Sequence, residues 1–209
     1  MIKYKLTTQN LTTHNDFQWE IGIKQTTSGE GGLCGPGYLH YYHHPLLAVL
    51  LNPIHARIKN PKLFEVEAGG VHLDDNGLKG GCTEMTLIRE IELPKFTDIQ
   101  RVAFGILCAK EVYKDLEWNE WAAAWLDGSD RSRSAAAAAA HAAAYAAAYA
   151  AYYAADAAAR AAHAAHAARA AHAAYYAADA AYAAYYAAAA AARNTGIDLI
   201  AIATKALEY

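Results

Sequence analysis

Cysteine is scarce in this chain of 209 residues, where only Cys34, Cys82 and Cys108 occur. An odd and sparse set of cysteines does not support a disulfide framework, so the composition favours a reducing cytoplasm. The first ten residues also lack the apolar run of a secretory signal. We therefore expect a cytoplasmic protein.

An excess of positive charge is absent as well. Residues 1–126 carry 12 basic and 15 acidic side chains, and residues 127–209 carry six of each. Nucleic acids bind surfaces with clustered Lys and Arg, because these residues neutralise phosphates. The balance of charge therefore excludes nucleic acid from the expected partners.

Familiar catalytic motifs are missing too. The sequence contains no phosphate-binding loop, dinucleotide fingerprint, G-x-S-x-G motif or H-E-x-x-H motif. We therefore assign no catalytic residue and expect no cofactor.

Glycine and proline are absent from residues 135–192, where 41 of the 58 residues are alanine and the others are Tyr, His, Asp or Arg. Alanine has the highest helix propensity, so this segment predicts one α-helix, about 87 Å long at about 1.5 Å per residue. We call residues 135–193 the rod. The window from Ser134 to Asp156 has no fixed charge, but alanine is weakly apolar and tyrosine prefers the membrane interface, so we expect no membrane span.

The surface of the rod offers methyl groups and nine tyrosines. Alanine faces let two helix backbones approach closely, and tyrosine adds a larger apolar area with a hydroxyl group at its rim. We therefore expect the rod to bind further copies of this chain. The expected interface consists of Tyr145, Tyr149, Tyr152, Tyr153, Tyr175, Tyr176, Tyr182, Tyr185 and Tyr186.

The predicted fold class is α+β. A small mixed α/β head (1–126) is followed by a junction (127–134), the rod (135–193) and a short amphipathic C-terminal helix (194–209). Hydrophobic periodicity and turn signals predict strands at 2–7, 17–23, 62–70 and 83–93, and helices at 44–53, 97–115, 117–126 and 198–209.

Single residues mark the ends of several predicted helices. Thr97 is an expected N-cap, Gly128 an expected helix end, and Asp198 lies near the start of the last helix. We expect that last helix to pack on the head, on the rod or on a neighbouring subunit. Trp118, Trp121 and Trp125 recur on one helix face, which is typical of core packing.

One loop of the head concentrates residues that can bind ligands. Zinc usually needs two closely spaced ligand pairs, and here the second pair is missing, so we expect no metal site. A nucleophilic pair of Cys34 and His40 is conceivable but has no evident third residue to orient it. A glycine-shaped loop with aromatic and histidine packing is the interpretation that the pattern favours, and a small-ligand pocket with aromatic walls is the alternative. The candidate residues are Cys34, Gly37, Tyr38, His40, Tyr41, Tyr42, His43 and His44.

The segments YKLTTQNLT (4–12), FQWEIG (17–22) and C-x-x-G-Y-x-H (34–40) resemble an uncharacterised domain family of phages, prophages and bacteria. Such proteins often end in Ala-rich repeats and a short helix similar to NTGIDLIAIATKALEY. The resemblance implies no established activity. Cys34, Gly37 and His40 match the loop of that family, but its usual second cysteine is replaced here by Tyr or His, which weakens a metal or redox role.

These observations favour a non-enzymatic interaction protein that assembles with itself, as an oligomer or filament, through the rod. A phage or host protein is a further partner to consider. The first alternative is a small-ligand or nucleotide-binding accessory protein of a phage that counters host defence. The second is an enzyme, either of ADP-ribosyl-transfer type or a Cys-His hydrolase.

Overall fold

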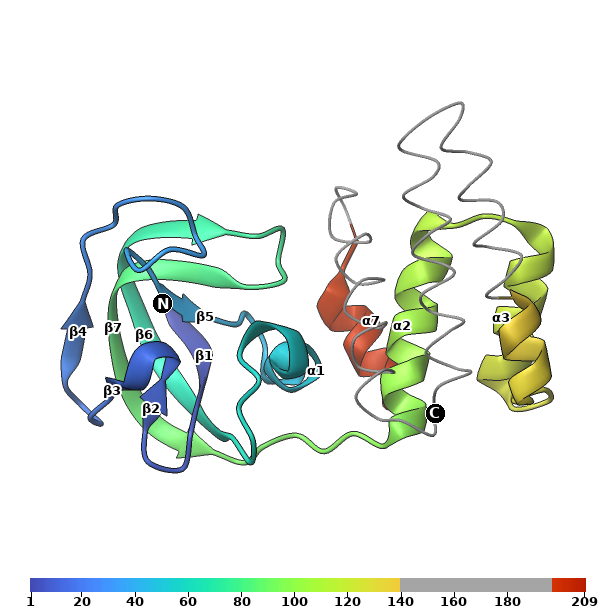
Figure 1. The fold of residues 1–209 in the computed structure, drawn as a ribbon, viewed down its shortest axis with the longest axis horizontal. Coiled ribbons are helices and arrows are strands. Elements are labelled where there is room, and N and C mark those ends of the chain that lie inside the picture. The colour runs from blue at the N-terminus through green and yellow to red at the C-terminus, as the bar shows by residue number, and fades with distance from the viewer. Residues whose placement is uncertain (140–196) are drawn as a thin grey trace. The chain divides into compact units, whose positions relative to one another are not determined.

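The structure is a computed structural model that describes residues 1–139 and 197–209 (Figure 1). The chain forms two compact units, Met1–Lys95 (unit 1) and Phe96–Tyr209 (unit 2). The expected head, 1–126, therefore contains unit 1 and the first part of unit 2. The backbone is helical over 133–139, where the predicted rod begins. The rest of the rod and its nine tyrosines lie outside the described residues.

Unit 1 is built around a five-stranded antiparallel sheet (Figure 1). A single helix, α1, contacts strand β1. A separate two-stranded sheet pairs β2 with β3. The main sheet contains β1 (Ile2–Thr7), β4 (Lys24–Thr26), β5 (Leu39–Tyr41), β6 (Lys62–Asp74) and β7 (Gly80–Ile91), and the smaller elements are β2 (Thr12–Thr13), the 3-10 turn η1 (His14–Asp16), β3 (Phe17–Gln18) and α1 (Pro45–His55).

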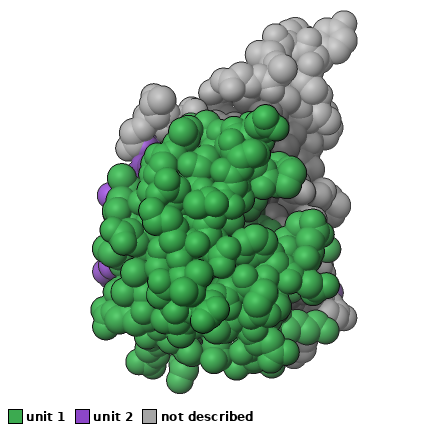
Figure 2. Space-filling view, turned by 90° about the vertical axis from the view of Figure 1, so that its left-hand side faces the viewer, with its two compact units in different colours: residues 1–95 green, residues 96–209 purple. Residues whose placement is uncertain are grey.

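The strands of unit 1 form a closed ring of backbone pairing. Strand β1 pairs with β6, β6 with β7, and the start of β7 with β5. Directly after β5, Tyr42 pairs back with Tyr4 of β1 through hydrogen bonds of 3.0 and 2.7 Å. This closure encloses a core that includes Trp19, Phe64 and Leu87. Figure 2 shows one face of this unit in green.

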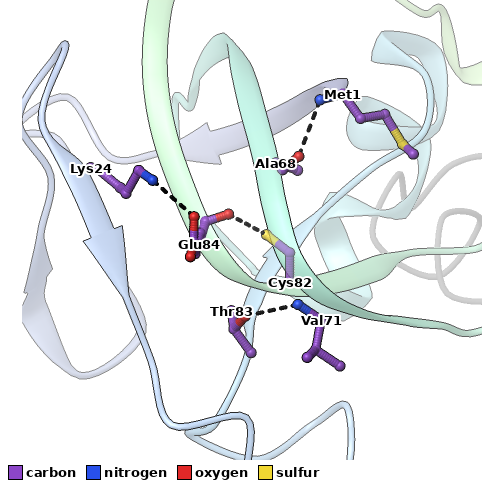
Figure 3. Close-up of polar contacts among 7 residues, drawn as sticks. All are labelled: Met1, Lys24, Ala68, Val71, Cys82, Thr83 and Glu84. Carbon is purple, nitrogen blue, oxygen red and sulfur yellow. Dashed lines mark hydrogen bonds and ion pairs between the residues drawn. The ribbon is translucent and has the colours of Figure 1, made fainter.

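The long β6–β7 hairpin bends in its middle, where the register shifts between Gly69 and His72. Hydrogen bonds secure the backbone at and beside this bend (Figure 3). The Val71 amide donates to Thr83 Oγ1 at 2.9 Å, and the Met1 ammonium donates to the Ala68 carbonyl at 3.1 Å. A bulge with an unpaired residue increases strand bending and twist, which allows the sheet to close.

Short strand β4 is tied to the outer edge of β7. Its Lys24 forms an ion pair of 2.9 Å with Glu84, whose carbonyl accepts a bond from the Cys82 thiol (Figure 3). The strand predicted at 17–23 proved too long. Only Phe17–Gln18 pairs as a strand, because β2, its partner, has just two residues. Ile21 then forms an isolated bridge with Leu87, and Gly22, with a φ of 81°, turns the chain before β4 begins.

The other predicted strands of unit 1 are confirmed at 2–7, 62–70 and 83–93, although the hairpin extends further towards its turn than expected. Helix α1 is confirmed with Pro45 at its first position. It continues past Pro53 to His55, because a proline removes one backbone donor without forbidding a final turn.

Unit 2 contains helices α2 (Asp98–Val112), α3 (Leu116–Asp127) and α7 (Leu199–Ala206). Three predicted boundary residues are confirmed. Thr97 and Gln100 form a reciprocal capping box, Gly128 adopts a left-handed conformation with a φ of 85°, and Asp198 caps α7. These boundaries follow from sequence because each depends on contacts within a few residues.

Helix α7 packs against α2, which lies within the expected head (Figure 1). The Gln100 side chain donates to the Leu207 carbonyl at 3.0 Å and links the two helices. On α3, Trp118 and Trp125 are each 2% exposed, as core packing predicts, whereas Trp121 is only partly buried. Across the described residues, every helix is too short or too polar to cross a bilayer; the uncharged window 134–156 lies mostly outside them.

Candidate functional site

A cavity of about 450 Å³ lies within unit 1. Its walls come from β1, the segment around β2 and β3, residues 27–42 (which include β5), the end of α1 and the β6–β7 turn. Its described lining residues are Lys5, Leu6, Thr13, His14, Asn15, Phe17, Trp19, Thr27, Cys34, Gly35, Pro36, Tyr38, Leu39, His40, Tyr41, Tyr42, His55, Ala56, Ile58 and Lys79. Among these residues there is no Asp or Glu, so the charged side chains of the lining are basic.

Glycines allow the segment from Thr27 to Tyr42, here called the aromatic loop, to lie close to the β6–β7 hairpin. A Cβ atom on Gly80 would lie 2.3 Å from the Tyr41 ring, and one on Gly81 would lie 2.5 Å from Leu33. Within the loop, a Cβ atom on Gly37 would lie 2.1 Å from the Glu30 carbonyl oxygen. A larger residue at Gly80 or Gly81 would push Tyr41 or Leu33 away from β7, and one at Gly37 would collide with the backbone of Glu30 within the loop.

Lys5 is the most unusual residue of the cavity. Its side chain is 6% exposed, and its Nζ atom donates to the His40 carbonyl at 2.8 Å and lies 4.6 Å from the centre of the Trp19 ring. Within the described ranges, no carboxylate lies within 4.0 Å of this ammonium. Burial lowers the pKa of Lys5 to about 8, although Cys82 partly opposes the shift.

Trp19 forms the wall beside Lys5. The indole is 2% exposed, and its Nε1 atom donates to Thr13 Oγ1 at 2.9 Å. Phe17 packs at its edge, with ring centroids 5.1 Å apart. Because its polar atom is bonded and its ring is packed, Trp19 presents a fixed aromatic face to the Lys5 ammonium.

Two histidines of the lining are held in their neutral form. Burial lowers the pKa of His40, whose Nε2 atom bonds to the Leu33 carbonyl. His55 stacks on Tyr42 with an interplanar angle of 16°, and burial together with Lys79 and His40 lowers its pKa to about 4. A carbonyl only accepts, so His40 Nε2 carries the hydrogen and the neutral ring keeps Nδ1 as an acceptor.

Cys34 and Lys79 meet at the cavity from two separate loops. The Lys79 ammonium donates to Cys34 Sγ at 3.3 Å, and Cys34 is exposed. The other thiols, Cys82 and Cys108, are free and buried, and burial raises the pKa of both. Cys34 is therefore the accessible thiol of the three.

Three predicted site residues are not in the cavity lining. Gly37 shapes the loop, and His44 accepts the Leu46 amide as the N-cap of α1. His43 lies between Lys3 and Asp74, with Nδ1 2.8 Å from Lys3 Nζ and Nε2 bonded to the Asp74 carboxylate. The cavity does bring together Cys34, Tyr38, His40, Tyr41 and Tyr42.

Sequence reasoning missed Lys5, Trp19, His55 and Lys79. Alternation along 2–7 predicts a strand, but it places Lys5 on a polar face, whereas Lys5 and Leu6 are both buried in the structure. Consecutive strand residues point to opposite faces, so both faces of β1 are covered here. Only the long-range closure of the sheet reveals this, and no local pattern carries that information.

In the structure, Cys34 and His40 each bond to another residue and not to one another. His40 Nε2 bonds to Leu33, and Cys34 Sγ accepts from Lys79, so the hydrogen bonds of these two side chains lead away from each other. Among the described residues, no group of three His, Cys, Asp or Glu side chains is placed to hold a metal ion. The cavity instead combines amines, neutral imidazoles and aromatic rings.

Comparison with known proteins agrees with the division into units. Residues 1–99 match a family described as "Domain of unknown function (DUF7666)". The match ends near the boundary of unit 1 at Lys95. No curated protein and no solved structure matches the chain. Residues 1–99 are thus similar to an uncharacterised domain, as the sequence resemblance implies, whereas the match does not extend to a phage origin or to Ala-rich repeats.

Proposed function

We propose that unit 1 binds a small organic anion with an aromatic ring, and that nucleotides are the ligand class to test first. The observation that carries this proposal is Lys5, a buried ammonium in a cavity with no acidic side chain among its described lining residues. A buried charge without a counterion is costly, and an anionic ligand would supply the counterion.

The shape of the cavity supports a small-molecule ligand. Its volume of about 450 Å³ falls in the range of about 300 to 1,000 Å³ that is usual for such sites. Trp19, Tyr38 and Tyr42 are all less than 9% exposed and give the cavity rigid aromatic walls. Flat rings stack favourably on such walls, which favours a ligand with an aromatic ring over a simple inorganic anion.

The charges of the cavity match this ligand at neutral pH. With a pKa of about 8, Lys5 is mostly protonated at pH 7, and Lys79 adds a second ammonium. His40 and His55 stay neutral because burial lowers their pKa values. They can therefore hydrogen-bond to a base or sugar without adding charge.

Fluorescence provides a test, because Trp19 lines the cavity and the other three tryptophans, Trp118, Trp121 and Trp125, lie in unit 2. Titration with nucleoside monophosphates should quench Trp19 emission, and calorimetry should give the same dissociation constant. Lys5→Met should weaken binding by about ten- to a hundredfold, since a hydrogen bond to a charged group contributes about 1.5–3 kcal/mol.

Lys24→Met is the matched control, because Lys24 is exposed and pairs with Glu84 outside the cavity. This variant should bind like the wild type. Trp19→Phe should remove the quenching while calorimetry still detects binding. If the panel of nucleotides and simpler aromatic acids gives neither quenching nor heat with the wild type, the proposal is wrong.

Self-assembly through the rod is a second proposed function. What supports it is the sequence itself, with 41 alanines and nine tyrosines in residues 135–192. Light scattering of the full chain at micromolar concentration tests it. A concentration-dependent rise in mass is expected, and a monodisperse monomer would contradict it.

An accessory role in a phage, with action against host defence, is the setting in which such a ligand-binding domain would work. This part of the proposal is supported by sequence resemblance alone. ADP-ribosyl transfer remains an alternative, and incubation with NAD followed by mass spectrometry of the products tests it. Unchanged NAD would remove that alternative.

A further inference from the structure

We propose that Lys5 is a reactive amine that forms an imine with a small carbonyl compound carrying an acidic group, such as an aldehyde phosphate or a keto acid. This proposal uses the cavity of the proposed function but adds a covalent step to it.

Position makes Lys5 different from an ordinary surface lysine. Lys5 lines the cavity, and its Nζ atom lies between the His40 carbonyl at 2.8 Å and the Trp19 ring at 4.6 Å. The amine contacts a backbone carbonyl and a ring face, and no carboxylate among the described residues pairs with it. A ligand atom in the cavity can therefore approach it.

Protonation favours reaction near neutral pH. Only a neutral amine has the lone pair that attacks a carbonyl carbon, and burial lowers the pKa of Lys5 from 10.5 to about 8. About a tenth of Lys5 is then neutral at pH 7, against fewer than one in a thousand for an unperturbed lysine. Desolvated lysines in apolar pockets are the usual imine-forming amines of proteins.

The covalent step is balanced without an oxidant or reductant. The Lys5 nitrogen adds to the carbonyl carbon, the resulting carbinolamine loses water, and a carbon–nitrogen double bond replaces the carbon–oxygen one. His40 lines the same cavity, and its neutral ring keeps Nδ1 as an acceptor, so it can take up and return a proton. Water is the only product that leaves.

Lys79, the second ammonium of the cavity, is the reason to expect an acidic group on the ligand. Lys79 lines the cavity and donates to Cys34 Sγ, and no carboxylate in the described parts of the chain pairs with it within 4.0 Å. A phosphate or carboxylate would accept from this ammonium in a charge-assisted hydrogen bond. One amine thus reacts with the carbonyl group while the other holds the anion.

Pyridoxal 5′-phosphate is a suitable probe, because it combines an aldehyde, a phosphate and an aromatic ring. Incubation of the full chain at pH 7.5, reduction with cyanoborohydride and peptide mass spectrometry should place the label mainly on Lys5. We expect labelling at least tenfold faster than at any exposed lysine, because a neutral amine is far more abundant at Lys5. Reduction traps imines but not thiol adducts, so Cys34 does not interfere.

Two variants and one pH series control the experiment. Lys5→Arg keeps the charge but should abolish the fast label, whereas Lys3→Arg, on the same strand and outside the cavity lining, should leave it unchanged. In the wild type, the labelling rate should rise with a midpoint near pH 8. Label spread evenly over exposed lysines, or a midpoint above pH 10, would overturn the proposal even if Lys5→Arg fails to fold.

Pyridoxine 5′-phosphate, which has an alcohol in place of the aldehyde, separates this inference from the proposed function. Saturable binding of pyridoxine phosphate without trapping of pyridoxal phosphate at Lys5 would refute the imine and support anion binding. Trapping of glyoxylate at Lys5 without binding of any nucleotide or pyridoxine phosphate would support the imine and refute the proposed aromatic ligand.

Discussion

The ammonium nitrogen of Lys5 lies 4.6 Å from the ring centre of Trp19, and the two side chains are 6% and 2% exposed. One residue belongs to β1 and the other follows β3, so the contact depends on the folded arrangement of unit 1. A cation–π contact recovers about 1–2 kcal/mol when it is desolvated, which offsets only part of the cost of burying a charge.

Removal of this charge should therefore stabilise the protein. The pKa of Lys5 is 10.5 in an unfolded chain and about 8 in the fold, so the unfolded state binds more protons between pH 8 and 10.5. The free energy of unfolding of the wild type should therefore rise with pH across that interval. Below pH 8 it is lowered by the full cost of burying the Lys5 charge. Lys5→Met, which keeps the side-chain length, should be about 1–3 kcal/mol more stable at pH 7 by urea unfolding.

The matched control is Lys24→Met, at an exposed position where the change should stay within about 0.5 kcal/mol. A less stable Lys5→Met protein, or a wild-type stability that does not change between pH 8 and 10.5, would show that the ammonium does not destabilise the folded protein. A more stable variant that binds ligand poorly would instead indicate that stability was sacrificed for function.

Acid should destabilise unit 1 through His55. Burial, Lys79 and His40 lower the pKa of His55 from 6.5 to about 4, so the unfolded chain takes up a proton before the folded one does. The stability contributed by neutral His55 is complete above pH 6.5 and is lost as the pH falls towards 4. Urea midpoints measured at pH 7 and pH 4.5 should show this loss.

In His55→Phe, which keeps an aromatic ring against Tyr42, the difference between the two midpoints should be smaller. Other acid effects act on both proteins and cancel in the comparison. An equal loss of stability in wild type and variant would assign the acid sensitivity to other groups.

Gly80→Ala should destabilise the protein, because the added methyl group collides with Tyr41, which lines the cavity. The new Cβ atom would lie 2.3 Å from the Tyr41 ring, and Tyr41 is 3% exposed and bonded to His72, so it has little room to move. We expect a loss of about 1–3 kcal/mol in the free energy of unfolding, as for other overpacked sites. Gly32→Ala, with no atom within 4 Å of the added Cβ, should be close to neutral. Similar stabilities for the two variants would contradict the close approach.

The sequence predicts local features of this protein well and its cavity only in part. Thr97, Gly128 and Asp198 were found because capping depends on the nearest few residues. The aromatic loop was found because its residues are adjacent in sequence. Lys5 was missed because it reaches the cavity through the pairing of β1 with β6, where Lys5 lies opposite Phe64, and alternation along β1 cannot show that both of its faces are covered. Lys79 was missed because the β6–β7 turn reaches the cavity only through the pairing of Gly80 with Tyr41 of β5.

Thiol labelling should report on occupation of the cavity. Cys34 is exposed and lines the cavity, whereas Cys82 and Cys108 are buried thiols whose pKa values are raised. Iodoacetamide should therefore modify Cys34 in the folded protein and leave the other two unmodified until urea unfolds the chain. A ligand that binds near Lys79 should slow the reaction of Cys34 with iodoacetamide. If a bound ligand leaves this reaction rate unchanged, the ligand binds outside the cavity.

A fragment of residues 1–95 should fold without the rest of the chain. The ring of strand pairing from β1 through β6, β7 and β5 back to Tyr4 lies wholly within unit 1, as does the core around Trp19 and Phe64. Chains of this length can bury enough apolar surface for independent stability. Trp19 would be the fragment's single tryptophan and, at 2% exposed, should emit at short wavelength until a cooperative urea transition shifts the emission to the red. Emission already at long wavelength, or a gradual change without a transition, would mean that unit 1 requires the rest of the chain in order to fold.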